Sequence, residues 1–179
     1  MASFSSLIKH SKKFAALAAI LGSVGAASIA VDFTAEHEGE VLTTYKDVAG
    51  VDTVCYGDTS PDMAIPGATY TREECLESLM DQLVQHAGPV AKCAPGVTKS
   101  PEMTAAFTSL AYNIGTGAFC RSTVVKRFKT GDYAGACGAM KMWNKAGGKE
   151  SPGLNNRRGH EYTLCMKGVP AMIAGGAAQ

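Results

Sequence analysis

Several common sequence signatures are missing from this chain. None of its six cysteines belongs to a CxxC or CxxH pair, which argues against a zinc site. There is no internal repeat, no nucleic-acid-binding motif, and nothing that indicates a metal or an organic cofactor. With 179 residues the chain also lacks the length for two large domains. We therefore expect one compact unit with its own hydrophobic core and no cofactor.

The formal net charge is only +1, but the charge changes sign along the chain. Residues 31–102 hold 13 Asp and Glu against four Lys and Arg, whereas residues 121–167 hold ten Lys and Arg against three Asp and Glu. The basic part could bind an anionic membrane or the acidic polymers of a cell wall, or it could simply solvate helix faces. We expect no nucleic-acid partner.

Three lysines, at positions 9, 12 and 13, precede an uncharged run over residues 14–31, and the next charge is Asp32. This is the layout of an export signal, because positive residues stay on the cytoplasmic side while the apolar run crosses the membrane. The run has 18 residues, close to the minimum of roughly 17 to 20 that spans a bilayer. We expect the rest of the chain to face the periplasm.

The run is rich in Ala, Gly and Ser, so it should hold the membrane weakly. Two fates follow from this composition. Ser28-Ile29-Ala30 resembles a small-x-small cleavage site of a removed signal peptide, or the segment stays attached and later leaves the bilayer. We favour the second. A third possibility, a buried helix of the soluble fold, is disfavoured by the preceding lysines and by the lack of an amphipathic pattern.

The next part of the chain predicts one hairpin between helices. Thr34 is a suitable N-cap for a short helix to about Leu42. Residues 42–59 then alternate polar and apolar side chains around Ala49-Gly50, as in a β-hairpin. A capping box of Thr71 and Glu74 predicts a helix to Ala87, ended by Gly88, with a loop over residues 87–101.

The C-terminal part predicts an all-helical lobe. Ser100-Pro101 starts a helix whose apolar face belongs in the core. Shorter helices are expected at 122–129, 132–143 and 154–167. Residues 168–179 are small and uncapped, and we expect them to form a flexible tail. The expected organisation is a signal segment (1–31), a folded domain (32–167) and this tail.

Glu38 and Asp47 could form the carboxyl pair that cuts a glycosidic bond. One carboxyl protonates the leaving oxygen, and the other activates water or stabilises the developing positive charge. Thr53 lies six residues beyond Asp47 on the returning strand, and this even separation across a four-residue turn allows both side chains to face one way. Taken alone, acids at 36, 38 and 40 are more often a solvated helix face.

The spacing of these residues resembles the phage lysozyme family. The run EGEVLTTYKDVAGVDTVCYGDT, which begins at Glu38, is similar to the family's Glu-Gly, Tyr-x-Asp, Gly turn and Thr signature. A second block is similar as well: AFTSLAYNIGTGAFCRSTVVKRF, GDYAGACGAM, KMWNKAGGK and SPGLNNRRGHEYTLC. The resemblance covers most of residues 34–166. It implies that Glu38 is the general acid, that Asp47 lies across the bond, and that Thr53 assists.

The resemblance also implies a fold. The family is α+β and mostly helical, with a small β-hairpin lobe and a larger helical lobe, here preceded by an apolar signal-anchor helix. In the family an Arg of the last helix lies against the catalytic Glu. Arg157 is the better match, and Arg158 is the alternative. The competing interpretation is that either Arg is an ordinary surface cation. Asp58 departs from the family, which commonly has a His there, so the local ion pair should be rearranged.

Six separated cysteines behind an export signal suggest up to three disulfides in an oxidising compartment, with fifteen possible connectivities. The family's helical lobe implies Cys120 with Cys137 and Cys93 with Cys165, which leaves Cys55 with Cys75. The apolar run has no cysteine and position 47 is Asp. Activation by exchanging a catalytic cysteine out of a disulfide is therefore excluded.

The resemblance implies an endolysin with muramidase activity that lyses the host at the end of the phage cycle. Its partners would be peptidoglycan strands and, through residues 14–31, the host inner membrane, and it would act as a monomer. The weak anchor resembles that of signal-anchor-release endolysins, which wait at the membrane and are then released to the periplasm. The stereochemistry implied is inversion. The alternatives are a lytic transglycosylase, against which Asp47 argues, and an inactive wall-binding protein.

Overall fold

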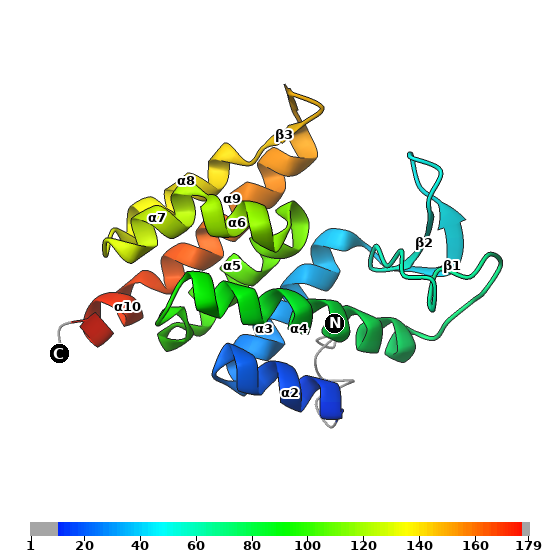
Figure 1. Cartoon of the computed structure of the whole chain (residues 1–179), viewed down its shortest axis with the longest axis horizontal. Coiled ribbons are helices and arrows are strands. Elements are labelled where there is room, and N and C mark those ends of the chain that lie inside the picture. Colours follow the sequence, from blue (N-terminus) through cyan, green and yellow to red (C-terminus); the bar gives the residue numbers. More distant parts are fainter. Residues whose placement is uncertain (1–10, 177–179) are drawn as a thin grey trace.

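A computed structural model describes residues 11–176 of the chain. Lys9, counted above among the lysines of the export signal, and residues 177–179 of the expected tail lie outside this range. The described part is mostly helical, and the hairpin of β1 (Val41–Lys46) and β2 (Asp52–Cys55) stands at one side of the helices (Figure 1). Helix α4 (Arg72–Cys93) runs from the hairpin side toward the remaining helices, as expected of a helix that links two lobes (Figure 1).

The first two described helices carry most of the apolar run. Helix α2 (Lys12–Leu21) and helix α3 (Val24–Glu38) are capped by the side chains of Ser11 and Ser23. Between them Gly22 adopts a φ of 86°, and the two helices are bent by 108°. Within residues 11–176 neither helix could span a bilayer alone, although the bent pair together has enough length and apolar character.

In this structure the apolar run contributes to the core, the arrangement that the sequence analysis disfavoured, although Ala15, Ala16 and Val24 remain exposed. Phe14, Leu17, Leu21 and Val31 are almost fully buried. Helix α3 packs against α2, α4 and α5, so several of its faces are covered. A helix that is buried on several sides needs no single apolar stripe. The sequence predicted that a helix begins at Thr34. This prediction is wrong, because Thr34 is a buried residue in the middle of α3.

The predicted hairpin is confirmed. Strand β1 (Val41–Lys46) pairs antiparallel with β2 (Asp52–Cys55), and Tyr45 lies opposite Thr53. The Asp47 carboxylate closes the turn, because its Oδ1 accepts hydrogen bonds of 2.8 Å from the backbone N–H groups of Ala49 and Val51. The local sequence thus produces both the turn and the position of Asp47 at its start.

Helix α4 (Arg72–Cys93) begins at the predicted capping box but does not end at Gly88. It continues through Pro89, which cannot donate a backbone hydrogen bond. Two interactions beyond the proline hold this last turn, namely the burial of Val90 and a disulfide from Cys93 to Cys120. The expected loop over 87–101 is therefore shorter, and a 3₁₀ turn (Val97–Lys99) lies within it.

Helix α5 (Pro101–Ile114) crosses the core of the helical lobe, where Phe107 contacts Phe119 and Phe128 edge-on. The helices expected near 122, 132 and 154 are all present. The remaining elements are α6 (Thr116–Arg121), α7 (Thr123–Lys129), α8 (Tyr133–Ala139), a 3₁₀ turn (Met140–Met142), the paired strands β3 (Lys145–Ala146) and β4 (Lys149–Glu150), and α9 (Pro152–Lys167).

Residues 169–176 of the expected flexible tail are helical in the structure. Helix α10 (Val169–Gly176) follows α9 directly, and Val169 and Met172 are buried against the helical lobe. Two apolar anchors, one turn apart, are enough to dock this short helix. The Ala- and Gly-rich composition hid them.

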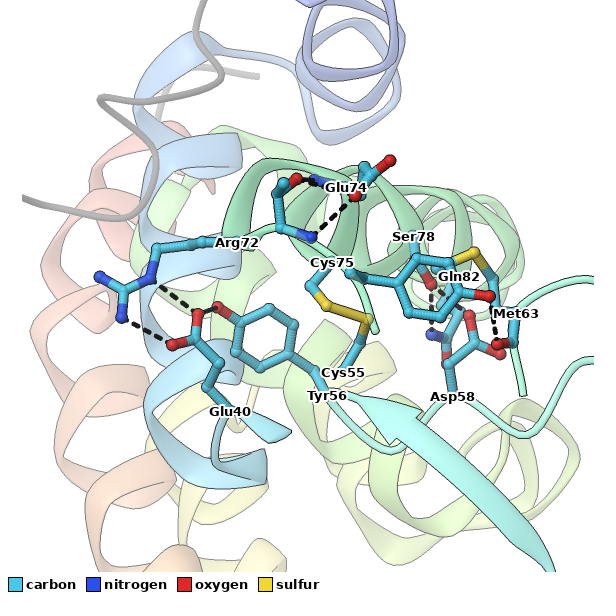
Figure 2. Close-up of a disulfide and its surroundings, with 12 residues drawn as sticks. Glu40, Cys55, Tyr56, Asp58, Met63, Arg72, Glu74, Cys75, Ser78 and Gln82 are labelled. Carbon is cyan, nitrogen blue, oxygen red and sulfur yellow. Dashed lines mark hydrogen bonds and ion pairs between the residues drawn. A yellow bond between two sulfur atoms is a disulfide. The ribbon is translucent and has the colours of Figure 1, made fainter. Parts of the chain in front are cut away.

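All six cysteines are paired in the structure. The Cys55–Cys75 pairing is confirmed and joins β2 to α4 (Figure 2). The other two expected pairings are wrong, since Cys93 joins Cys120 and Cys137 joins Cys165. The physical reason is helix packing: α4 contacts α6, and α8 contacts α9.

Candidate functional site

Glu38 is the last residue of α3, and the helix ends there because Gly39 adopts a φ of 75°. Its side chain is 19% exposed, and Oε1 accepts a hydrogen bond of 2.7 Å from Nη1 of Arg157. On the other side is Gly57, just after β2, where an added Cβ would lie 3.8 Å from Glu38 Oε2. The carboxylate thus lies between α9 and the base of the hairpin, within reach of solvent.

Of the two neighbouring arginines in α9, the structure brings Arg157 to Glu38. The side chain of Arg158 turns elsewhere, to Asn113 at 2.5 Å and to Glu161 at 2.8 Å. Both arginines are buried, so neither is an ordinary surface cation. Burial lowers the pKa of the Arg158 guanidinium, an effect that the Glu161 carboxylate opposes.

Asp47 and Thr53 lie at the two sides of the hairpin turn. Thr53 is on β2, opposite Tyr45 in the register, and Asp47 follows the end of β1, where its N–H donates to the Val51 carbonyl. Thr53 is almost buried, and its hydroxyl also donates to the Val51 carbonyl, at 3.1 Å.

Asp58, the departure from the family pattern, is buried beneath the hairpin. Its carboxylate accepts a hydrogen bond from the Ser78 hydroxyl (Figure 2). It also accepts one of 2.8 Å from the Ser60 N–H, and its backbone pairs with Val54. Ser78 belongs to α4. Asp58 therefore ties the loop after β2 to α4 through neutral donors, which is a structural task.

Glu40, two residues beyond Glu38, anchors the chain where it leaves α3 (Figure 2). Its carboxylate accepts from Arg72 Nε at 2.8 Å, from Arg72 Nη2 at 2.6 Å and from the Tyr56 hydroxyl at 2.9 Å. The Arg72 guanidinium lowers the pKa of Glu40, and burial raises the pKa of Tyr56. This cluster lies beside the Cys55–Cys75 disulfide and fixes the hairpin relative to the end of α3.

His37 and His160 join α3 to α9 next to the Glu38–Arg157 pair. Nδ1 of His37 lies 2.7 Å from the Phe33 carbonyl and donates to it, and Nε2 lies 3.0 Å from His160 Nδ1. Burial lowers the pKa of His37, and the nearby charge of Arg157 adds to the effect.

Sequence reasoning missed Glu40, Glu161, Ser109 and the histidine pair. A signal existed only for Glu161, which falls three and four residues after two arginines in a helix, the spacing of intrahelical ion pairs. The others depend on contacts between elements far apart in the chain.

The sequence profile of the phage lysozyme family matches residues 35–161. A SAR-endolysin of Bacteriophage PS119 is 41% identical over 132 residues, which cover 73% of this chain and 77% of that protein. A SAR-endolysin of Enterobacteria phage P21 is 39% identical over 131 residues, with 73% and 78% covered.

Among solved structures, the endolysin from Escherichia coli O157:H7 phage FAHEc1 superposes with a TM-score of 0.71 at 31% identity. The superposition covers 77% of this chain and 90% of that one. These similarities confirm the expected mostly helical, lysozyme-like fold with small antiparallel sheets.

Proposed function

The chain belongs to the phage lysozyme family, and from this premise we propose that it is an endolysin that cuts peptidoglycan as a muramidase. The bond cleaved is the β-1,4 linkage between N-acetylmuramic acid and N-acetylglucosamine. One observation supports the proposal: a solvent-accessible carboxyl, Glu38, is held by a buried arginine at the base of a hairpin that carries Asp47 at its turn and Thr53 on its returning strand.

In this mechanism Glu38 donates its proton to the glycosidic oxygen as the bond to the anomeric carbon breaks. A water attacks that carbon from the opposite face, and Asp47 accepts the proton that the water loses. Thr53, on the returning strand of the hairpin, holds the water. The products are two hydroxyl ends, and the configuration at the anomeric carbon is inverted. No cofactor takes part in these steps.

The decisive experiment is mass spectrometry of the products released from purified peptidoglycan by the full-length chain. We expect reducing muramic acid ends from the wild type and none from Glu38→Gln. Glu36→Gln is the matched control, because Glu36 is an exposed carboxylate of the same helix, and it should retain activity. Anhydromuramic products would identify a transglycosylase. Binding to peptidoglycan without any product would identify an inactive wall-binding protein.

We propose that residues 14–31 export the chain to the periplasm, anchor it weakly in the inner membrane and then leave the bilayer intact. The lysines before the run and its length support insertion. The burial of Leu17, Leu21 and Ala27 supports retention after release, because cleavage after Ala30 would remove α2 and half of α3 from the core. After intact release, the folded domain would begin near residue 12, where α2 starts, and not at residue 32 as the sequence analysis expected.

Release can be tested by cell fractionation. Replacing exposed alanines of α2, Ala15 and Ala16, by leucine strengthens the membrane segment without touching the core. The chain should then remain in the membrane fraction and lyse cells more slowly. A mature N-terminus after Ala30 in the released protein would contradict intact release. Light scattering of the released protein should give a monomer.

A further inference from the structure

A buried carboxylate lies behind the pair formed by Glu38 and Arg157. Glu161 in α9 has no exposed surface, and Arg157 precedes it by one helical turn. Its Oε1 accepts hydrogen bonds from Arg157 Nε at 3.2 Å and from the Ser109 hydroxyl at 2.9 Å. A buried carboxylate is costly unless it is paired and hydrogen-bonded. The mechanism described above makes no use of this residue.

Ser109 closes a ring with these two side chains. Its hydroxyl donates to Glu161 and lies 3.4 Å from Nη2 of Arg157, which donates to it. Ser109 belongs to α5 and is fully buried. The guanidinium of Arg157 is therefore held along two of its positions, Nε and Nη2, by groups from two helices.

A guanidinium is rigid and planar, so fixing two of its nitrogens determines where the third one points. The third is Nη1, and it points to Glu38 Oε1 at 2.7 Å. Arg157 therefore links Glu161 to the Glu38 carboxyl. The orientation of Glu38 thus depends on Glu161 through the planar geometry of one side chain.

Charge gives Glu161 a second effect. A neighbouring cation favours the ionised form of a carboxyl, whereas a general acid must carry its proton. The negative charge of Glu161 partly neutralises the positive charge of Arg157, and Glu161 also forms an ion pair with Arg158 at 2.8 Å. The other charged or titratable groups near Glu38 and Arg157 are Tyr112 of α5, Asp58 of the loop after β2 and His37 of α3.

We propose that Glu161 is a positioning residue for the reaction: with Ser109 it orients Arg157, which holds the Glu38 carboxyl for proton transfer. The inference rests on the proposed function, because the proposed function assigns Glu38 as the general acid. Glu161 touches no reacting atom, and it acts only through Arg157.

The first test compares Glu161→Gln with Glu150→Gln, which removes an exposed carboxylate of β4. For Glu161→Gln we expect kcat to fall about 10- to 100-fold, as for a misplaced catalytic group, with KM changed less than about threefold. The basic limb of the pH–rate profile should also move to lower pH, because the full charge of Arg157 then faces Glu38. Glu150→Gln should match the wild type in both measurements.

A double-mutant cycle separates positioning from general stabilisation. If Glu161 acts through Arg157, adding Glu161→Gln to Arg157→Ala should lower kcat no further. Losses that multiply in the double variant would overturn the proposal. Ser109→Ala is a second variant that removes no charge, and it should reproduce the fall in kcat at a smaller size even if Glu161→Gln folds poorly.

An NMR measurement makes the test independent of muramidase activity. The Nε–H signal of Arg157, assigned by its absence in Arg157→Lys, should exchange slowly with solvent in the wild type and in Glu38→Gln. In Glu161→Met, which has no strong acceptor at this position, it should exchange rapidly. A signal that stays protected in Glu161→Met would show that Glu161 does not hold Arg157. If peptidoglycan yields no muramic acid ends, the proposed function fails, and this signal still decides the positioning.

Discussion

Leu17→Ala tests whether the apolar N-terminal segment is a structural part of the folded enzyme. Leu17 is fully buried in α2, which packs against α4. Truncating such a leucine removes about 3 kcal/mol, within the range measured for buried Leu→Ala changes. In a protein of this size each kcal/mol lowers the unfolding temperature by about 2–4 °C. We therefore expect the released, oxidised protein to melt about 6–12 °C lower.

Val24→Ala is the matched control, because Val24 belongs to the same apolar run but is 64% exposed. Its effect on stability should stay within about 0.5 kcal/mol, as for most surface changes. Both variants make the membrane segment less apolar, so a difference between them reports packing in the folded enzyme. Circular dichroism during thermal unfolding measures both. If Leu17→Ala melts within about 2 °C of the control, α2 does not contribute to the core in solution and the reasoning is refuted.

Three further predictions concern the rest of the fold. Non-reducing peptide mapping should find the Cys93–Cys120 pair, and replacing both cysteines by serine should lower the free energy of unfolding by about 2–4 kcal/mol; a Cys120–Cys137 peptide would contradict the structure. Ser78→Ala removes a donor from a buried carboxylate and should cost about 1–3 kcal/mol in urea unfolding, whereas no change would mean that water replaces the hydroxyl. Because the folded pKa of His37 lies below its ordinary value, the unfolded state binds the proton first, and stability should fall as the pH drops below about 6.5. His37→Gln should show a weaker fall in melting temperature between pH 7.5 and 5, and an unchanged slope would exclude His37 as its source.

Local signals in the sequence predicted local structure well. The capping box of α4 and the turn at Asp47 both involve groups within four residues of each other. Such interactions form in almost any tertiary context, so they can be recognised without it. The same signals misplaced the end of α4, because Gly88 and Pro89 are helix breakers whose effect was outweighed by the distant burial of Val90 and by the Cys93–Cys120 bond.

Local sequence signals predicted part of the candidate site. The helix that carries Glu38 was expected to run to about Leu42, whereas Gly39 ends it at Glu38. Asp47 at a turn and Thr53 on the returning strand follow from turn chemistry and the two-residue period of a strand. Family resemblance then assigned their parts.

Only the tertiary structure decided which distant groups meet. It selected the partners of four cysteines, placed α2 and α3 in the core, and set Glu161 and Ser109, 52 residues apart, around Arg157. Each of these contacts depends on how whole helices pack, and packing is a property of complementary surfaces that no short stretch of sequence carries.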